Sequence, residues 1–127
     1  MTHEEALSFP GAPLAERRLH PERMGVYFII EANEIQYIGS SVNLKLRLDQ
    51  HRISKRWNRD AEIRWILFHR SLWVEMTNFE HILIYQMCPP QNVVMNPATE
   101  SDRSWTIHPT SVWAKTIIER AKSEYME

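Results

Sequence analysis

The stretch "GVYFIIEANEIQYIGSSVNLKLRLDQH", Gly25 to His51, decides how this chain folds. Its first part, Gly25–Glu31, is rich in β-branched and aromatic residues and predicts a strand. Ile35–Gly39 predicts a second strand, and the three residues between the two, 32–34, have the length of a hairpin connection. The pair therefore predicts an antiparallel hairpin centred on Asn33.

This hairpin would place two tyrosines on one face of the sheet. In a hairpin centred on Asn33, Tyr37 lies opposite Ile29, and odd-numbered residues share a face. Gly39 likewise lies opposite Tyr27 and, without a side chain, leaves a hollow there. A register shift of one residue would send the tyrosines to opposite faces. Tyrosines are common in strands, so for either one alone a packing role is the better interpretation.

The continuation to His51 fits two structures. A half-buried strand would explain the alternation of apolar with polar residues at Val42, Leu44, Leu46 and Leu48. Against it, Ser40 and Ser41 are good N-caps, and most of the following residues are good helix formers. We therefore expect a helix.

On this helix, Asn43, Arg47 and His51 fall four residues apart and form one polar stripe. Leu44 and Leu48 form the adjacent stripe, which would face the core. The polar stripe then lies at the edge of the buried face, where its side chains can reach a cleft. Surface helices often carry such residues for solubility, so Arg47 and His51 alone indicate little.

The remaining chain predicts one more strand and two more helices. Ala61–His69 reads as a strand, and Leu72–Met87 has helical spacing that ends before Pro89 and Pro90. Thr110–Met126 starts with a Thr/Ser cap and repeats apolar residues at three and four, which predicts an amphipathic C-terminal helix.

Glu80 lies inside an apolar stripe of the predicted helix. The stripe consists of Met76, Phe79, Leu83, Ile84 and Met87. A carboxylate there is costly to desolvate unless a cation or hydrogen-bond donors meet it. Thr77 and Glu80 also have capping-box spacing, which would give Glu80 a structural role if the helix began at Thr77. The helix formers and apolar residues over 72–76 favour an earlier start and hence a functional carboxylate.

Composition narrows the class of protein. A chain of 127 residues suits a single domain, and no apolar run is long enough to cross a bilayer. Cys88 is the only cysteine, which excludes an internal disulfide and favours a reducing, cytoplasmic (intracellular) location. The net charge of −1 means that any nucleic-acid surface must be local.

With these residues identified, the chain resembles the GIY-YIG nuclease family. "GVY" at Gly25–Tyr27 is similar to the first half of the name motif, and "YIG" at Tyr37–Gly39 is the second half. "SSVNLKLRLDQH" resembles the helix that carries the family's arginine, and "FEHILIYQMCPPQN" resembles the later helix with its metal-binding glutamate. The resemblance covers Glu22–Asn96. Val26 replaces the isoleucine of the motif, and Ser40 stands where some repair nucleases carry a lysine.

The resemblance implies an α/β (α+β) fold: a small central three-stranded, mostly antiparallel sheet flanked by helices, with an extra C-terminal helix. We expect three parts: an irregularly packed N-terminal leader (1–22), indicated by its four prolines or glycines and its lack of periodicity, a GIY-YIG nuclease core (23–97), and a C-terminal helical extension packed on the core (98–127). The implied activity is that of a metal-dependent DNA endonuclease, which hydrolyses phosphodiester bonds.

The resemblance also implies roles for the candidate residues. Glu80 would ligate Mg²⁺, for which Mn²⁺ could substitute, because a hard cation takes oxygen ligands and keeps several waters. Arg47 would contact the phosphate and stabilise the transition state. Tyr27 and Tyr37 would flank the attacking water, one of them as general base.

His51 would assist by hydrogen bonding or proton relay, and Asn92 would position other groups. Contacts with DNA are expected from the neighbouring polar, basic and aromatic side chains, namely Ser40, Ser41, Asn43, Lys45, Arg52, Lys55, Arg56 and Trp57. Trp57 could stack on a base or sugar, and a packing role is at least as good an interpretation.

Two rival functions remain open on the sequence. One is a catalytically weak or inactive module of this fold that binds nucleic acid and acts with a partner protein. The other is a protein-interaction domain whose tryptophans mark a partner surface; these are Trp57, Trp65, Trp73, Trp105 and Trp113. Because the net charge is near neutral, a homodimer or a partner protein could supply specificity for DNA.

Overall fold

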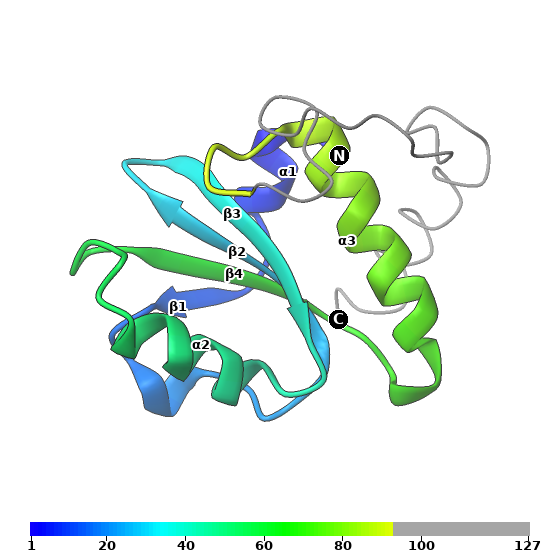
Figure 1. Cartoon of the computed structure of the whole chain (residues 1–127), viewed down its shortest axis with the longest axis horizontal. Helices are drawn as coiled ribbons and strands as arrows, with labels where there is room; N and C mark the ends of the chain where they lie inside the picture. The colour runs from blue at the N-terminus through cyan, green and yellow to red at the C-terminus, as the bar shows by residue number, and fades with distance from the viewer. Residues whose placement is uncertain (93–127) are drawn as a thin grey trace.

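The computed structural model describes residues 1–92, which form a four-stranded antiparallel sheet with helices on both faces (Figure 1). In chain order the elements are α1 (His3–Leu7), β1 (Gly11–Pro13), the 3₁₀ turn η1 (Arg17–Leu19), β2 (Gly25–Glu31), β3 (Glu34–Ser41), α2 (Leu44–Ile53), β4 (Glu62–Leu67), the 3₁₀ turn η2 (Arg70–Leu72) and α3 (Trp73–Met87). The predicted C-terminal helix and extension lie outside the described residues. Within 1–92, none of the helices has the length and apolarity needed to span a membrane.

The central hairpin has the predicted register but a different turn. The connection is two residues, Ala32 and Asn33, instead of the expected three. Both have positive φ, 52° and 62°, as a type I′ turn requires. An irregularity in the β2–β3 pairing leaves Gln36 as an extra residue, a β-bulge that offsets the shorter turn. Tyr37 therefore still lies opposite Ile29, as predicted.

The sheet has four strands where three were expected, in the order β1-β4-β2-β3. The additional strand, β1, comes from the segment that the sequence predicted to be an irregular leader. It pairs antiparallel with the outer edge of β4, with Ala12 opposite Ile63. Because β1 is only three residues long and ends in proline, it carries no period-two signal that would reveal it.

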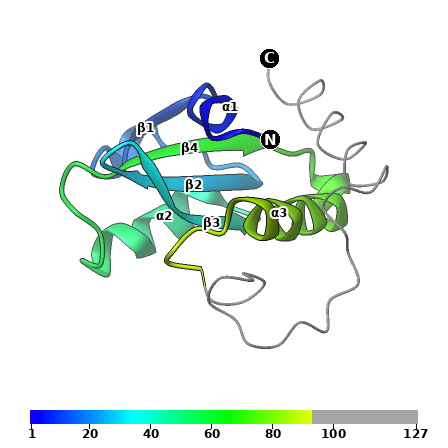
Figure 2. The same cartoon turned by 90° about the horizontal axis from the view of Figure 1, so that it is seen from above.

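The alternation of side chains along β2 builds two cores. Its even-numbered residues pack with α1 and α3, in a cluster that includes Val26, Phe28, Phe79 and Leu83. Its odd-numbered residues face α2, in a cluster that includes Tyr27, Ile29, Leu44 and Leu48. Figure 2 shows α3 in front of the strands and α2 behind them. The two tyrosine motifs therefore lie on the face of the sheet that α2 covers.

Helix α2 begins at Leu44, two or three residues later than a cap at Ser41 or Ser40 would place it. Ser40 and Ser41 belong to β3 and do not cap the helix, which corrects the prediction. Asn43 is the N-cap, and its side-chain oxygen accepts a backbone N–H of the first turn. The helical prediction itself is confirmed, and Leu44 and Leu48 are fully buried against the sheet, as expected.

Candidate active site

The two tyrosines share one face and approach each other closely. Their ring centroids are 6.1 Å apart, and Gly39 lies opposite Tyr27, as the register predicted. Tyr27 fills the space that the glycine leaves, since a Cβ at Gly39 would collide with its ring and hydroxyl. Tyr27 is fully buried, whereas Tyr37 remains partly exposed. Gly39 is thus needed for a phenol to reach this position.

His51 joins the tyrosines from α2. Its Nε2 lies 2.7 Å from the Tyr27 hydroxyl, and its ring centroid is 5.3 Å from that of Tyr37. On the other side of the ring, the indole N–H of Trp57 donates a hydrogen bond to Nδ1 at 3.2 Å. The sequence left two roles open for Trp57, stacking on DNA and packing within the protein; the side chain is buried against His51, which favours packing.

Burial shifts the pKa values of these two groups in ways that keep both neutral. Burial, and then the positive charges of Arg47 and Arg56, lowers the pKa of His51 to about 4. Burial and the neighbouring Tyr37 raise the pKa of the Tyr27 phenol, whereas Arg47 opposes the increase. Proton removal from Tyr27 thus depends on nearby positive charge.

The lowered pKa of His51 predicts a loss of stability in acid. Between pH 6.5 and 4 the unfolded chain binds a proton at His51 that the folded chain does not bind, so stability falls as the pH decreases. The full loss is at most about 3 kcal/mol, reached near pH 4. Urea unfolding at pH 7.5 and pH 4.5, monitored by circular dichroism, measures this loss of unfolding free energy.

The control for this effect is His51→Gln, because a glutamine side chain at position 51 does not titrate in this range. The drop in unfolding free energy between the two pH values should be smaller in the variant than in the wild type. Equal drops would show that His51 is already protonated, or does not change its environment on folding. Burial also lowers the pKa of His20, which therefore adds to the loss of stability in acid. Because both proteins contain His20, its contribution cancels when the two drops are compared.

Arg47 lies on the same side of α2 as His51 but is exposed. Its guanidinium donates to the side-chain oxygen of Gln50 at 3.0 Å. Interaction with Tyr27, and to a smaller extent with Tyr37, raises the pKa of Arg47. A permanent positive charge therefore lies within reach of both phenols and open to solvent.

Glu80 lies on α3 and points toward the end of β3. Ser40 donates a hydrogen bond to its carboxylate at 2.6 Å, a contact that the sequence did not reveal. Burial raises the pKa of Glu80, while Ser40, His81 and Arg47 oppose the increase. Because α3 begins at Trp73, the capping-box role that required a start at Thr77 is excluded.

Asn92 supports the β3 strand directly. Its side-chain oxygen accepts the N–H of Ile38, and its amide donates to the carbonyl of the same residue, both at 2.8 Å. Ile38 lies between the second tyrosine and Gly39, so this pair of bonds fixes the backbone of the "YIG" segment. The role of Asn92 in positioning groups of the site stays a prediction.

Some of the predicted DNA contacts support local structure. The backbone N–H of Asn43 donates to the Ser41 hydroxyl, which in turn donates to the Asn43 carbonyl. The Lys45 ammonium lies 3.9 Å from the Glu22 carboxylate. These bonds shape the turn between β3 and α2.

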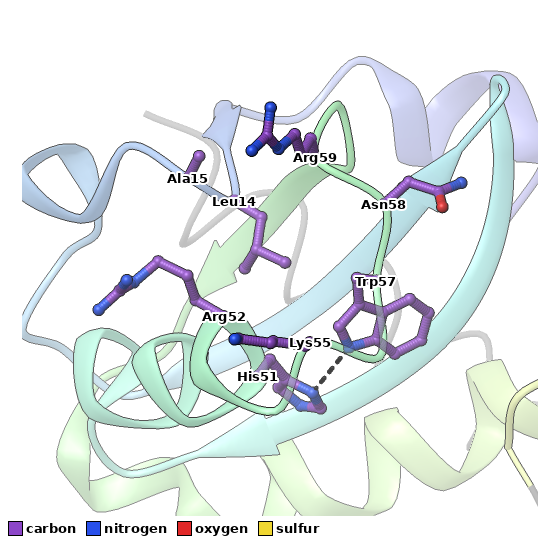
Figure 3. Close-up of a pocket in the computed structure, with 8 residues that line it drawn as sticks. All are labelled: Leu14, Ala15, His51, Arg52, Lys55, Trp57, Asn58 and Arg59. Carbon is purple, nitrogen blue, oxygen red and sulfur yellow. Dashed lines mark hydrogen bonds between the residues drawn. The ribbon is translucent and has the colours of Figure 1, made fainter.

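Three of the other predicted contacts, Arg52, Lys55 and Trp57, line a cavity of about 690 Å³ beside His51, between α2 and the loop that follows it (Figure 3). Arg59, which was not among the predicted contacts, also lines it. Leu14 lines the opposite side. Arg52 also donates to Asp49, while no ion pair involving Lys55 or Arg59 occurs within residues 1–92. The cavity is therefore a positively charged hollow next to the tyrosine cluster.

Comparison with known proteins identifies the type of domain. A family model described as "GIY-YIG catalytic domain" matches residues 23–97. The magnesium-bound crystal structure of the GIY-YIG N-terminal endonuclease domain of UvrC from Thermotoga maritima is 26% identical, with a TM-score of 0.52, and the match covers 62% of this chain and 93% of that chain. A point mutant of that domain, bound to its catalytic divalent cation, is 24% identical with the same TM-score, over 62% and 93%. No curated protein matches.

Proposed function

Because the chain belongs to the GIY-YIG catalytic-domain family, we propose that it is a divalent-metal-dependent endonuclease that hydrolyses phosphodiester bonds in DNA. The observation that supports this most directly is the position of Arg47. Its charge acts on Tyr27, Tyr37 and Glu80, which come from three different elements. Four side chains that a phosphodiesterase could use are therefore close enough to interact electrostatically.

The cluster can stabilise a crowded, negatively charged phosphate. The Arg47 guanidinium stays charged at all relevant pH values and matches the geometry of phosphate oxygens. It is exposed, so a phosphate in solution can reach it. The two phenols lie beside it, one buried and one partly exposed, and either could hold or deprotonate the attacking water. Tyr37, the partly exposed one, has the easier access to solvent.

Glu80 fits the requirements of a Mg²⁺ ligand. The Ser40 hydroxyl bonds one carboxylate oxygen and leaves the other for a cation, whose charge would offset the cost of burial. Within residues 1–92, no cluster of three or more His, Cys, Asp or Glu side chains forms a protein cage for a metal. A hard cation that keeps most of its waters, such as Mg²⁺, suits a single carboxylate. When bound, it would supply positive charge near the leaving oxygen.

The positively charged cavity beside His51 supports a path for the DNA backbone next to the cluster. Its basic residues, Arg52, Lys55 and Arg59, can neutralise phosphates that flank the scissile bond. With a net charge of −1 for the whole chain, such local contacts give only weak non-specific affinity. A homodimer or a partner protein would then supply specificity.

A nicking assay with supercoiled plasmid tests the proposed function. We expect conversion to open circles in Mg²⁺ or Mn²⁺, no conversion in EDTA, and recovery when Mg²⁺ is added in excess, because the carboxylate alone cannot stabilise the leaving oxygen. A parallel panel of branched and single-stranded DNA identifies the preferred substrate. Undiminished cutting in EDTA would contradict the metal requirement. DNA binding without nicking on any substrate would instead favour the inactive binding module.

A further inference from the structure

The two hydrogen bonds of the His51 ring determine where its proton lies. The Trp57 indole nitrogen donates to Nδ1 at 3.2 Å, and an indole N–H can only donate. Nδ1 therefore carries no proton. In the neutral ring the single proton must then be on Nε2, which lies 2.7 Å from the Tyr27 oxygen. His51 is thus the donor in its bond with Tyr27, and the Tyr27 oxygen is the acceptor.

We propose that Trp57 is a positioning residue of the nuclease site, which holds His51 as an Nε2–H donor aimed at the hydroxyl oxygen of Tyr27. The proposal rests on the proposed function, since it assigns the role of one residue within that site. It goes beyond that function because it decides between the two roles that the sequence left open for His51. The histidine serves as a hydrogen-bond donor and not as a proton acceptor.

The surroundings hold the histidine ring in place. The His51 ring packs edge-on against Tyr27, Tyr37 and Trp57, with centroid distances of 5.5, 5.3 and 5.9 Å. Arg56 lies 5.1 Å from the Trp57 ring centroid, and its guanidinium donates to Gln91. His51 and Trp57 are both about nine-tenths buried, and Figure 3 shows the bond between them. The indole therefore has a fixed direction.

The direction of this bond limits what each group can do. An Nε2 that carries a proton cannot accept one from Tyr27. His51 donates to the Tyr27 oxygen, and the positive charge of Arg47 acts on it as well; both favour the negatively charged form of the phenol over its neutral form. The hydroxyl proton of Tyr27 then points away from His51. Trp57 contributes to this arrangement without any contact with the reacting atoms.

Nitrogen-15 NMR of the histidine side chains tests the proposal without reference to nuclease activity. At pH 7.5, the His51 signal, identified by its absence from His51→Gln, should show a pyrrole-type Nε2 and a pyridine-type Nδ1. Trp57→Phe removes the indole donor but keeps an aromatic ring, and it should shift His51 toward the other tautomer. Trp73→Phe, at an exposed position on α3, is the matched control and should leave the signal unchanged.

Two NMR results would overturn the proposal: a pyrrole-type Nδ1 in the wild type, or an unchanged tautomer in Trp57→Phe. If Trp57→Phe does not fold, the wild-type spectrum decides alone. Should the wild type not cut DNA although Nε2 carries the proton, the proposed function fails but the assignment of Trp57 and His51 stands.

Activity provides a second, independent test. The side-chain amide of Gln can donate to Tyr27 as Nε2–H does, but it cannot accept a proton. His51→Gln should therefore nick plasmid at least about tenfold faster than His51→Ala, which restores no donor. Circular dichroism confirms that both variants are folded. Equal loss in the two variants would contradict the donor role and favour proton transfer to His51.

Discussion

Replacing Glu80 with glutamine is expected to abolish plasmid nicking while leaving the protein as stable as the wild type, or more stable. The carboxylate lies in the apolar stripe of α3, and burial already raises its pKa. An amide of the same shape avoids the cost of desolvating a charge and can still accept the hydrogen bond from Ser40. It is, however, a poor ligand for Mg²⁺. The loss of rate should be about 10³-fold or more.

A matched control is Glu75→Gln, which makes the same change of charge in the first turn of α3, five residues earlier. Its nicking rate should equal that of the wild type. Urea unfolding of all three proteins gives the stability comparison, and activity across a range of Mg²⁺ concentrations tests whether excess metal restores cutting. A Glu80→Gln variant that cuts normally would exclude this carboxylate as the metal ligand. A variant that is inactive because it is unfolded would show a structural role instead.

The face shared by the tyrosines was predictable because alternate residues of a strand point to the same face of the sheet. Any hairpin that places Gly39 opposite Tyr27 puts both phenols on one side of the sheet. The sequence prediction obtained this register with the wrong turn, since Ala32 and Asn33 form a two-residue connection and a bulge at Gln36 compensates. The local propensities of Asn33 could not distinguish a three-residue loop from a tight turn followed by a bulge.

Glu80 was also detectable from the sequence, because a charge within an apolar helical stripe requires an explanation. Its partner was not detectable. Ser40 was expected to cap α2, and only the extension of β3 through Ser41 carries its hydroxyl to the carboxylate of α3. A contact between residues forty positions apart depends on how the elements pack, and no local spacing encodes it.

The contact between Trp57 and His51 depends on the backbone after α2. Lys55 adopts a positive φ of 57°, which turns the chain back so that the indole reaches the histidine. Nothing in the residues around Trp57 predicted this conformation, and a tryptophan among basic side chains resembled a surface for stacking on bases. Strand β1 was not predicted for a similar reason: it forms by pairing with β4, which lies about fifty residues away in the sequence.

Replacing Arg47 with alanine should have the largest effect on the rate, and it should do so at little cost in stability. The side chain is exposed, and its bond to Gln50 is a surface contact, so the free energy of unfolding should change by less than about 0.5 kcal/mol. An arginine that stabilises a phosphoryl transition state contributes about 10³- to 10⁵-fold in rate. We therefore expect single-turnover nicking to fall at least 10³-fold.

Arg47→Lys separates charge from geometry, since lysine keeps the positive charge but loses the fork that binds two phosphate oxygens. Its rate should lie between those of the wild type and Arg47→Ala. Arg18→Ala, which removes an equally positive side chain that is 84% exposed, should cut like the wild type. If Arg47→Ala still cuts at a rate near that of the wild type, the cluster of Tyr27, Tyr37 and Glu80 does not form a phosphodiesterase site. If Arg47→Lys cuts as fast as the wild type, only the positive charge is needed, and binding of two phosphate oxygens by the guanidinium does not contribute to the rate.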